Sequence, residues 1–162
     1  HHFRDEALLR HALTHASKGQ ENYERLEFLG DRVLGLCIAE LIFTTFPFET
    51  EGGMAKRHAA LACTETLVDV AKELDIASVI FLSDAERAAG GLHQGNLLAD
   101  AMEAVIGALY LDGGLEACKS VIHGLWGEKV HVLTTPPLDP KTGLQEWAQA
   151  RKLPTPVYTI LS

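Results

Sequence analysis

Two pairs of acidic residues stand out because each pair interrupts an apolar helical pattern. Glu27 and Asp31 are four residues apart, so they share one face of a helix in which apolar residues recur at helical spacing. The same row becomes apolar along the chain, at Leu34 and Ile38. The two acids therefore lie at the end of a buried face, where an unpaired carboxylate is costly. A metal cation is the natural partner for such a pair.

A second stretch, residues 96–113, carries the other acidic pair. It is apolar almost all round, which is typical of a buried central helix. Before its final Asp112, its only charged residues are Asp100 and Glu103, three apart and so on one face. Two buried helices with one acidic pair each predict a cluster of four carboxylates. Hard oxygen ligands of this kind suit magnesium, or manganese in its place, rather than zinc.

A simpler interpretation is that these acids only complement helix dipoles. That covers Asp100, which is near a helix start, but not Asp31 or Glu103, which lie deep within their segments. A solvated acidic stripe explains one pair and not both on such apolar helices. The metal-site interpretation is therefore the stronger one.

Four motifs resemble those of the ribonuclease III family, in the same order and spacing. Residues 24–31 read Glu-Arg-Leu-Glu-Phe-Leu-Gly-Asp, like the family signature, and residues 97–104 resemble its second acidic motif. Residues 12–17, Ala-Leu-Thr-His-Ala-Ser, and residues 51–54, Glu-Gly-Gly-Met, resemble two shorter motifs. The resemblance implies a magnesium-dependent endonuclease that cuts double-stranded RNA as a homodimer, leaving 5′-phosphates and short 3′ overhangs. Processing of rRNA precursors and of some mRNAs and tRNAs is the implied role, with no organic cofactor.

The resemblance also assigns roles to single residues of the acidic pairs. It makes Asp31 and Glu103 the residues most directly engaged in metal-bound catalysis. Glu27 and Asp100 complete the metal site with them. Because all four acids are present, the sequence argues against a catalytically inactive relative that only binds RNA.

Three further residues receive roles on the same grounds. Phe28 matches an aromatic residue that inserts into the partner subunit of the family dimer, and an ordinary core position is the alternative. Glu24 and Glu51 become auxiliary acids of the site. An acid in a loop, as expected for Glu51, is usually just solvated.

Composition indicates a globular protein in a reducing compartment. The 162 residues are 47% hydrophobic, enough for one good core plus an appendage, and no apolar run is long enough to cross a membrane. The three cysteines are odd in number and far apart, which favours the cytoplasm. A net charge of −8 argues against a simple nucleic-acid binder and fits an acidic body that relies on bound cations.

The elements expected to position the acids are all helices. We expect a first helix over residues 5–16 and the signature helix over residues 23–45. Gly30 and Gly35 weaken the signature helix, and close approach of another helix would explain them, with Gly107 as a candidate contact. Further helices are expected over residues 54–62 and 64–74. Gly52-Gly53 is expected to form a turn and Thr64 an N-cap. The body, residues 1–133, is therefore predicted to be an all-α endonuclease domain.

The C-terminal part reads as a linker and a fragment. Prolines make residues 134–140 a linker, and residues 141–162 resemble the start of a double-stranded RNA-binding domain, with a helix over 141–152 and a strand over 156–161. That resemblance assigns RNA contacts to four helix residues: Thr142, Gln145, Glu146 and Gln149. An all-α phosphohydrolase for small nucleotides is the remaining alternative, and this fragment argues against it.

Overall fold

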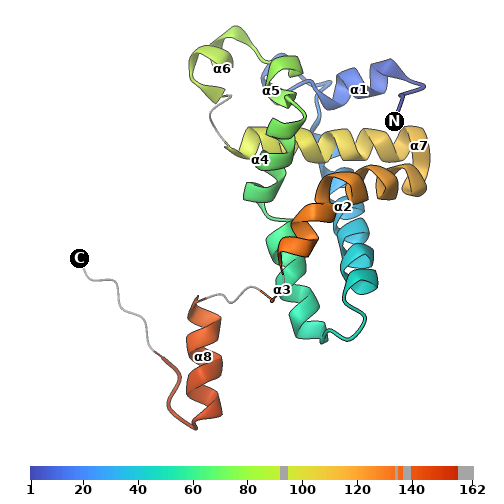
Figure 1. Cartoon of the computed structure of the whole chain (residues 1–162). Coiled ribbons are helices and arrows are strands. Elements are labelled where there is room, and N and C mark those ends of the chain that lie inside the picture. Colours follow the sequence, from blue (N-terminus) through green and yellow to red (C-terminus); the bar gives the residue numbers. More distant parts are fainter. Residues whose placement is uncertain (92–94, 134, 137–139, 157–162) are drawn as a thin grey trace.

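The computed structural model describes residues 1–91, 95–133, 135–136 and 140–156, and over these residues the protein is helical (Figure 1). It contains no β-strand in the described ranges, only an isolated bridge between Thr14 and Phe81. The all-α prediction for the body is therefore confirmed. No helix in this described part is long and apolar enough to cross a bilayer. In chain order the helices are α1 (Glu6–Ala12), η1 (Ala16–Lys18), α2 (Glu24–Thr45), α3 (Glu51–Leu61), α4 (Thr64–Glu73), α5 (Ile76–Val79), α6 (Asp84–Ala88), α7 (Gly95–Val132) and α8 (Pro140–Ala150).

The crossing of α2 and α7 organises the body (Figure 1). Two glycines permit it: a Cβ atom at Gly30 would collide with the backbone carbonyl of Glu103, and one at Gly107 would collide with that of Leu26. The expected close approach between these two glycines is thus confirmed. Gly35 differs, because a Cβ atom there would make only ordinary contact with the His58 ring, whose Nε2 lies 2.9 Å from the Gly35 carbonyl oxygen.

The core lies where α2, α4 and α7 pack together. Ile38, Ile106 and Trp126 are fully buried, so the apolar rows of α2 and α7 face each other as their sequence spacing predicts. The Trp126 indole Nε1 donates to the carbonyl oxygen of Leu61 at 2.9 Å, which ties α7 to the end of α3. α7 bends at Gly114, where φ is 77°, a left-handed conformation that glycine adopts without strain.

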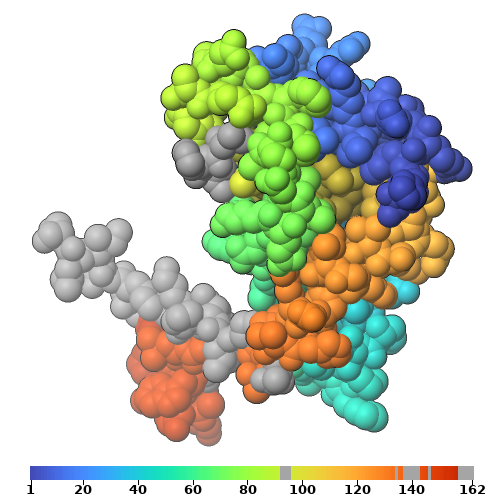
Figure 2. Space-filling model, turned by 45° about the horizontal axis from the view of Figure 1, so that its top comes forward, coloured from blue at the N-terminus to red at the C-terminus, as the bar shows by residue number. Residues whose placement is uncertain are grey.

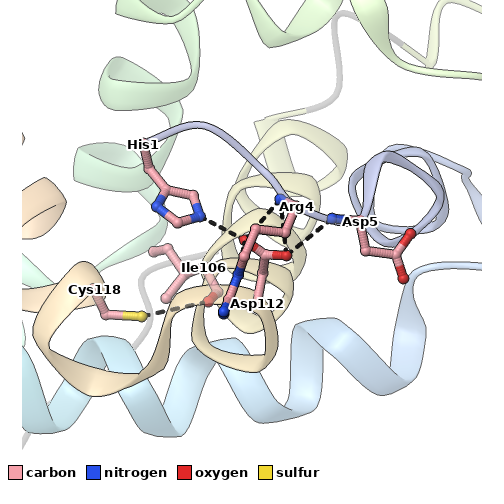
Figure 3. Close-up of polar contacts among 6 residues, drawn as sticks. All are labelled: His1, Arg4, Asp5, Ile106, Asp112 and Cys118. Carbon is pink, nitrogen blue, oxygen red and sulfur yellow. Dashed lines mark hydrogen bonds and ion pairs between the residues drawn. The ribbon is translucent and has the colours of Figure 1, made fainter.

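Asp112 fastens the N-terminal segment to α7 (Figure 3). The Asp112 side chain is buried, and its Oδ1 accepts hydrogen bonds from the backbone N–H groups of Arg4 at 3.1 Å and Asp5 at 3.0 Å. His1 Nε2 lies 2.7 Å from the Asp112 Oδ2. The side chain of Asp5 then caps α1 by accepting from Ala7 N at 2.9 Å. One buried acid therefore sets where α1 begins.

The first helix is shorter than expected. It ends at Ala12 rather than residue 16, because the chain then turns to pair with residues after α5. His15 N donates to the Phe81 carbonyl at 3.0 Å, and Phe81 N donates to the Leu13 carbonyl at 2.8 Å. These long-range hydrogen bonds outweigh the local helical preference of residues 13–16.

The expected turn at Gly52-Gly53 was wrong, as was the N-cap at Thr64. The two glycines lie in the first turn of α3, which the Thr50 side chain caps by accepting from Gly53 N at 3.1 Å. Glu51 is accordingly the first residue of a helix and not a loop residue. α4 begins at Thr64 itself, with Cys63 in the N-cap position.

The predicted C-terminal helix is present as α8, which begins at Pro140 and ends at Ala150. Figure 1 shows it apart from the helices of the body. The Trp147 and Leu144 side chains are about half exposed, at 49% and 45%. The predicted strand over 156–161 lies outside the described residues except for Pro156, as does most of the predicted linker.

Candidate metal centre

Three of the four predicted carboxylates converge at the α2–α7 crossing. Glu27 lies in the first turn of α2, and Asp100 and Glu103 lie on the facing side of α7. One carboxylate oxygen from each of these residues falls within 4.8 Å of the other two. The Gly30–Gly107 contact brings them together, because a bulkier residue at either position would push the two helices apart. The helix crossing and the acidic cluster are therefore one structural feature.

The three acids lack protein partners. Within the described part of the chain, none of their carboxylates forms an ion pair or a side-chain hydrogen bond. Burial first, and then the charges of Glu27 and Asp100, raise the pKa of Glu103 to about 7. Burial also raises the pKa of Glu27, with the nearby Asp100 and Glu24 adding to the effect, and burial raises the pKa of Asp100. The cluster is thus short of positive charge.

The donor set fits a hard divalent cation. Octahedral coordination at about 2.1 Å places ligand oxygens about 3 to 4.2 Å apart, which is compatible with three oxygens within 4.8 Å of one another. All three donors are carboxylates, the ligand type that magnesium and manganese prefer, and the group contains neither histidine nor cysteine. A cation there would also remove the repulsion among the three acids.

Asp31 is placed differently from the other predicted ligands. Its carboxylate is 45% exposed and pairs with the guanidinium of Arg32. Arg32 in turn lies over the Phe28 ring, 4.9 Å from the ring centroid. Asp31 remains one helical turn from Glu27 on the same face of α2, but the group of converging oxygens does not include it.

The other predicted site residues differ in their distance from the three acids. Glu24, the first residue of α2, is exposed and close enough to help raise the pKa of Glu27. Glu51 is exposed and lines a separate apolar cavity of about 320 Å³ beside Phe43. Phe28 is 66% exposed, which excludes the alternative of an ordinary core position.

Sequence reasoning missed two residues that lie beside the acidic cluster. Tyr23 is 3% exposed, and its pKa is raised by burial and by the charges of Asp100 and Glu27. The His15 ring stands edge-on to it, with ring centroids 5.5 Å apart, and its charge lowers the pKa of Asp100. The available signal was sequence position, since Tyr23 directly precedes the signature motif and His15 lies in the N-terminal motif.

The predicted RNA contacts lie on α8. All four positions, Thr142, Gln145, Glu146 and Gln149, fall within the helix at spacings of three and four, so they share one face. The Gln149 side chain is exposed and that of Gln145 is half-buried. Their role in RNA binding stays a prediction.

Comparison with known proteins identifies the family to which the chain belongs. A family model described as Ribonuclease-III-like matches residues 5–127. The chain belongs to the ribonuclease III family. Ribonuclease 3 of Ehrlichia ruminantium (strain Welgevonden) is 47% identical over 165 residues, covering 99% of this chain and 73% of that protein. Ribonuclease 3 of Nitrosococcus oceani is 47% identical over 162 residues, covering 98% of this chain and 70% of that protein.

A solved structure of the ribonuclease III nuclease domain from Campylobacter jejuni gives the same result for the fold. It superposes with a TM-score of 0.77 at 41% identity, covering 79% of this chain and 90% of that one. The helical body is therefore a ribonuclease III nuclease domain, and the protein is an endonuclease of that family. The predicted fold class of the body is confirmed, whereas the RNA-binding fragment at residues 141–162 stays a prediction.

Proposed function

We propose that the protein is a divalent-metal-dependent endoribonuclease that hydrolyses phosphodiester bonds in double-stranded RNA. The observation that carries the proposal is the convergence of Glu27, Asp100 and Glu103, whose carboxylates form no ion pair within the described part of the chain. A half-buried acidic group of this kind repels RNA phosphates on its own and attracts them only once a cation is bound. Family membership supports the nuclease chemistry.

The three acids hold the cation, and magnesium is the proposed ion, with manganese as a substitute. When bound, it supplies the activated water and the charge shielding that phosphodiester hydrolysis needs. The two helices orient the carboxylates, because each acid is fixed by the Gly30–Gly107 crossing rather than by a loop. Asp31, our fourth proposed ligand, reaches the site by leaving Arg32, a side-chain rotation within the same helix face.

We further propose that the protein acts as a homodimer with Phe28 at the interface. Phe28 is 66% exposed near the start of α2, and Leu36 and Phe43 are also exposed further along the same helix, so apolar surface is bare on α2. The Campylobacter jejuni nuclease domain is described as having a region involved in dimer formation, which supports a dimer here. Two active sites across one duplex would leave 5′-phosphates and short 3′ overhangs.

The cellular role remains part of the proposal. We infer action on rRNA precursors and on some mRNAs and tRNAs, in the cytoplasm, without an organic cofactor. The three cysteines are free and two of them are fully buried, as expected in a reducing compartment. Residues 141–162 are proposed to be the beginning of an RNA-binding domain, with 134–140 as its linker.

Cleavage of a long RNA duplex with and without magnesium tests the proposed activity. We expect cleavage to require magnesium and to proceed with manganese in its place. Added single-stranded RNA or free nucleotides should not inhibit cleavage of the duplex. Calcium should support duplex binding with little cleavage, since it accepts looser coordination than in-line attack needs. Magnesium-independent cutting, or a preference for small nucleotides, would refute the proposal.

Sedimentation of the Phe28→Ala variant tests the dimer. Because the side chain is exposed within one subunit, we expect its loss to leave the melting temperature of the subunit nearly unchanged while weakening association. An isologous interface loses the contact twice. Phe48→Ala is a matched control, since Phe48 is 99% exposed in the loop after α2. A monomeric wild-type protein would rule the dimer out.

A further inference from the structure

The acidic body pairs most of its cations with neighbouring acids. In the described residues, Arg57 binds Glu49 at 2.9 Å, and Lys129 binds Glu73 at 2.6 Å. Lys119 likewise contacts two glutamates. With 22 acidic and only 14 basic residues, any exposed cation has an excess of possible partners. A cation that stays apart from acids is therefore informative.

Two such cations lie on α1 and η1. Over the described ranges, neither Arg10 nor Lys18 has an acidic group within ion-pair distance. The Arg10 guanidinium is instead held over the Phe81 ring, 4.7 Å from its centroid. Both residues lie in the last turn of their helices, where positive charge is favourable, but that leaves their donor groups exposed to solvent.

Arg10 and Lys18 face the same furrow, which we call the α1 furrow. It has a volume of about 450 Å³ and is lined by these two cations together with Phe81 and Glu21. The other polar side chains along it are engaged: His11 Nε2 lies 2.6 Å from the Asn22 carbonyl, and the Thr14 hydroxyl donates to the Arg10 carbonyl. The two cations are thus the positively charged donors left for a ligand.

One segment links the α1 furrow to the start of α2. Thr14 and Lys18 line the furrow, the Thr14 carbonyl accepts from Tyr23 N at 2.9 Å, and the His15 ring lies edge-on to Tyr23 with centroids 5.5 Å apart. The bridge between Thr14 and Phe81 fixes this segment against the residues that follow α5. Figure 2 shows the N-terminal segment in blue against the green segment that contains α5 and α6.

We infer that the α1 furrow binds the phosphate backbone of the RNA duplex beyond the cleavage site, through Arg10 and Lys18. The inference rests on the proposed function, which supplies the polyanion. The protein has a net negative charge, so cations without acidic partners add local attraction for RNA phosphates to that of the bound metal. Arg10 is pre-ordered for this task, because the Phe81 ring already fixes its guanidinium.

Charge-reversal variants test the inference through binding. We would measure the affinity of Arg10→Glu and Lys18→Glu for a labelled RNA duplex in calcium, as a function of salt. Lys72→Glu is the matched control, since Lys72 is an exposed lysine on α4 that already pairs with Asp69 at 3.8 Å. We expect each furrow variant to weaken binding about tenfold and to reduce the salt slope by about one, with Lys72→Glu close to wild type.

Two further measurements keep the result interpretable. Arg10→Lys keeps the charge, so it should bind RNA nearly as well as wild type. If it binds as weakly as Arg10→Glu, the charge is not the cause and the inference fails. With magnesium, the furrow variants should raise KM while leaving kcat unchanged, because the acidic cluster is intact. If the wild-type protein cleaves RNA but Lys18→Glu binds RNA as well as Lys72→Glu does, the furrow inference is wrong and the proposed function stands. If the wild-type protein does not cleave RNA, the proposed function itself is wrong.

Discussion

Two acids on α7, the buried Asp112 and the partly buried Glu103, have opposite surroundings. Asp112 is 5% exposed and accepts hydrogen bonds from the backbone N–H groups of Arg4 and Asp5, with His1 Nε2 at 2.7 Å (Figure 3). Glu103 lies on the same helix, but its carboxylate converges with those of Glu27 and Asp100 and forms no ion pair or side-chain hydrogen bond within the described residues. One acid is saturated with donors and the other has none from the described residues.

The contrast between Asp112 and Glu103 shows that burial alone does not identify a functional acid. A buried carboxylate that accepts several hydrogen bonds is stable as an anion and works as a structural anchor. Partial burial, and then the charges of Glu27 and Asp100, raise the pKa of Glu103 to about 7, so its carboxylate is in an unfavourable state that a cation relieves. Such a site is maintained by the fold around it, here by the α2–α7 crossing.

The largest expected effect is loss of cleavage in Glu103→Gln. The substitution removes one negative charge from the cluster and keeps its shape, so we expect kcat/KM to fall about 10³-fold or more, equivalent to about 4 kcal/mol. Asp112→Asn, the matching change at the anchored acid, should retain cleavage below its melting temperature. Steady-state rates on a long duplex in magnesium would compare the two. Wild-type cutting by Glu103→Gln would show that the cluster is not the metal centre.

Gly30→Ala should disturb the cluster through the backbone. The added Cβ atom overlaps the Glu103 carbonyl, so the helices must separate, and overpacking of this kind costs about 3 kcal/mol. We expect a lower melting temperature together with weaker magnesium binding by calorimetry. Gly35→Ala is the control, because a Cβ atom there makes only ordinary contact with His58. Equal melting temperatures for both variants would contradict the role of the close crossing.

Local pattern was sufficient to predict the acidic cluster. Helical spacing placed Glu27 on one helix face and Asp100 with Glu103 on another, and the structure brings those three together. It could not predict that the Asp31 side chain turns to Arg32, because spacing fixes the face of a helix and not the rotamer on it. The exposed state of Phe28 likewise depended on which helices cover α2.

Competition from distant partners accounts for the error in the first helix. That helix ends early because residues 13–15 pair with Phe81, almost seventy residues away. The anchoring role of Asp112 was also beyond local pattern, since its partners Arg4 and Asp5 are more than a hundred residues earlier in the chain. At α3 the error was local instead: the Thr50 cap outweighed the turn tendency of two glycines.

Asp112→Ala should lower stability without affecting the metal centre. It leaves the backbone N–H groups of Arg4 and Asp5 without their acceptor, which costs about 2 kcal/mol for partly buried groups. For a chain of this length that corresponds to a melting temperature lower by roughly 4–8 °C. Magnesium affinity, measured by calorimetry below that temperature, should stay at the wild-type value. A loss of magnesium binding as large as that of Glu103→Gln would erase the distinction between the two acids.

The smallest expected effect is a pH dependence of stability in the metal-free protein. The pKa of Glu103 rises from 4.5 to about 7 on folding, so between these values the folded protein binds a proton that the unfolded chain has released. Stability therefore falls as pH rises through this window, and is fully reduced above it. The raised pKa values of Glu27 and Asp100 act in the same direction.

Because the Glu103 carboxyl is partly exposed, we expect an effect of about 1 kcal/mol rather than the full value of the shift. Thermal melts in a chelating buffer at about pH 5.5 and pH 8 would measure it. Glu103→Gln should flatten the profile, since the variant has no proton to lose there. Saturating magnesium should also flatten it at the upper end, because a bound cation replaces the proton as the partner of the carboxylate. A metal-free wild-type protein that is more stable at pH 8 than at pH 5.5, with the same slope in Glu103→Gln, would mean that the cluster is not the strained site described above.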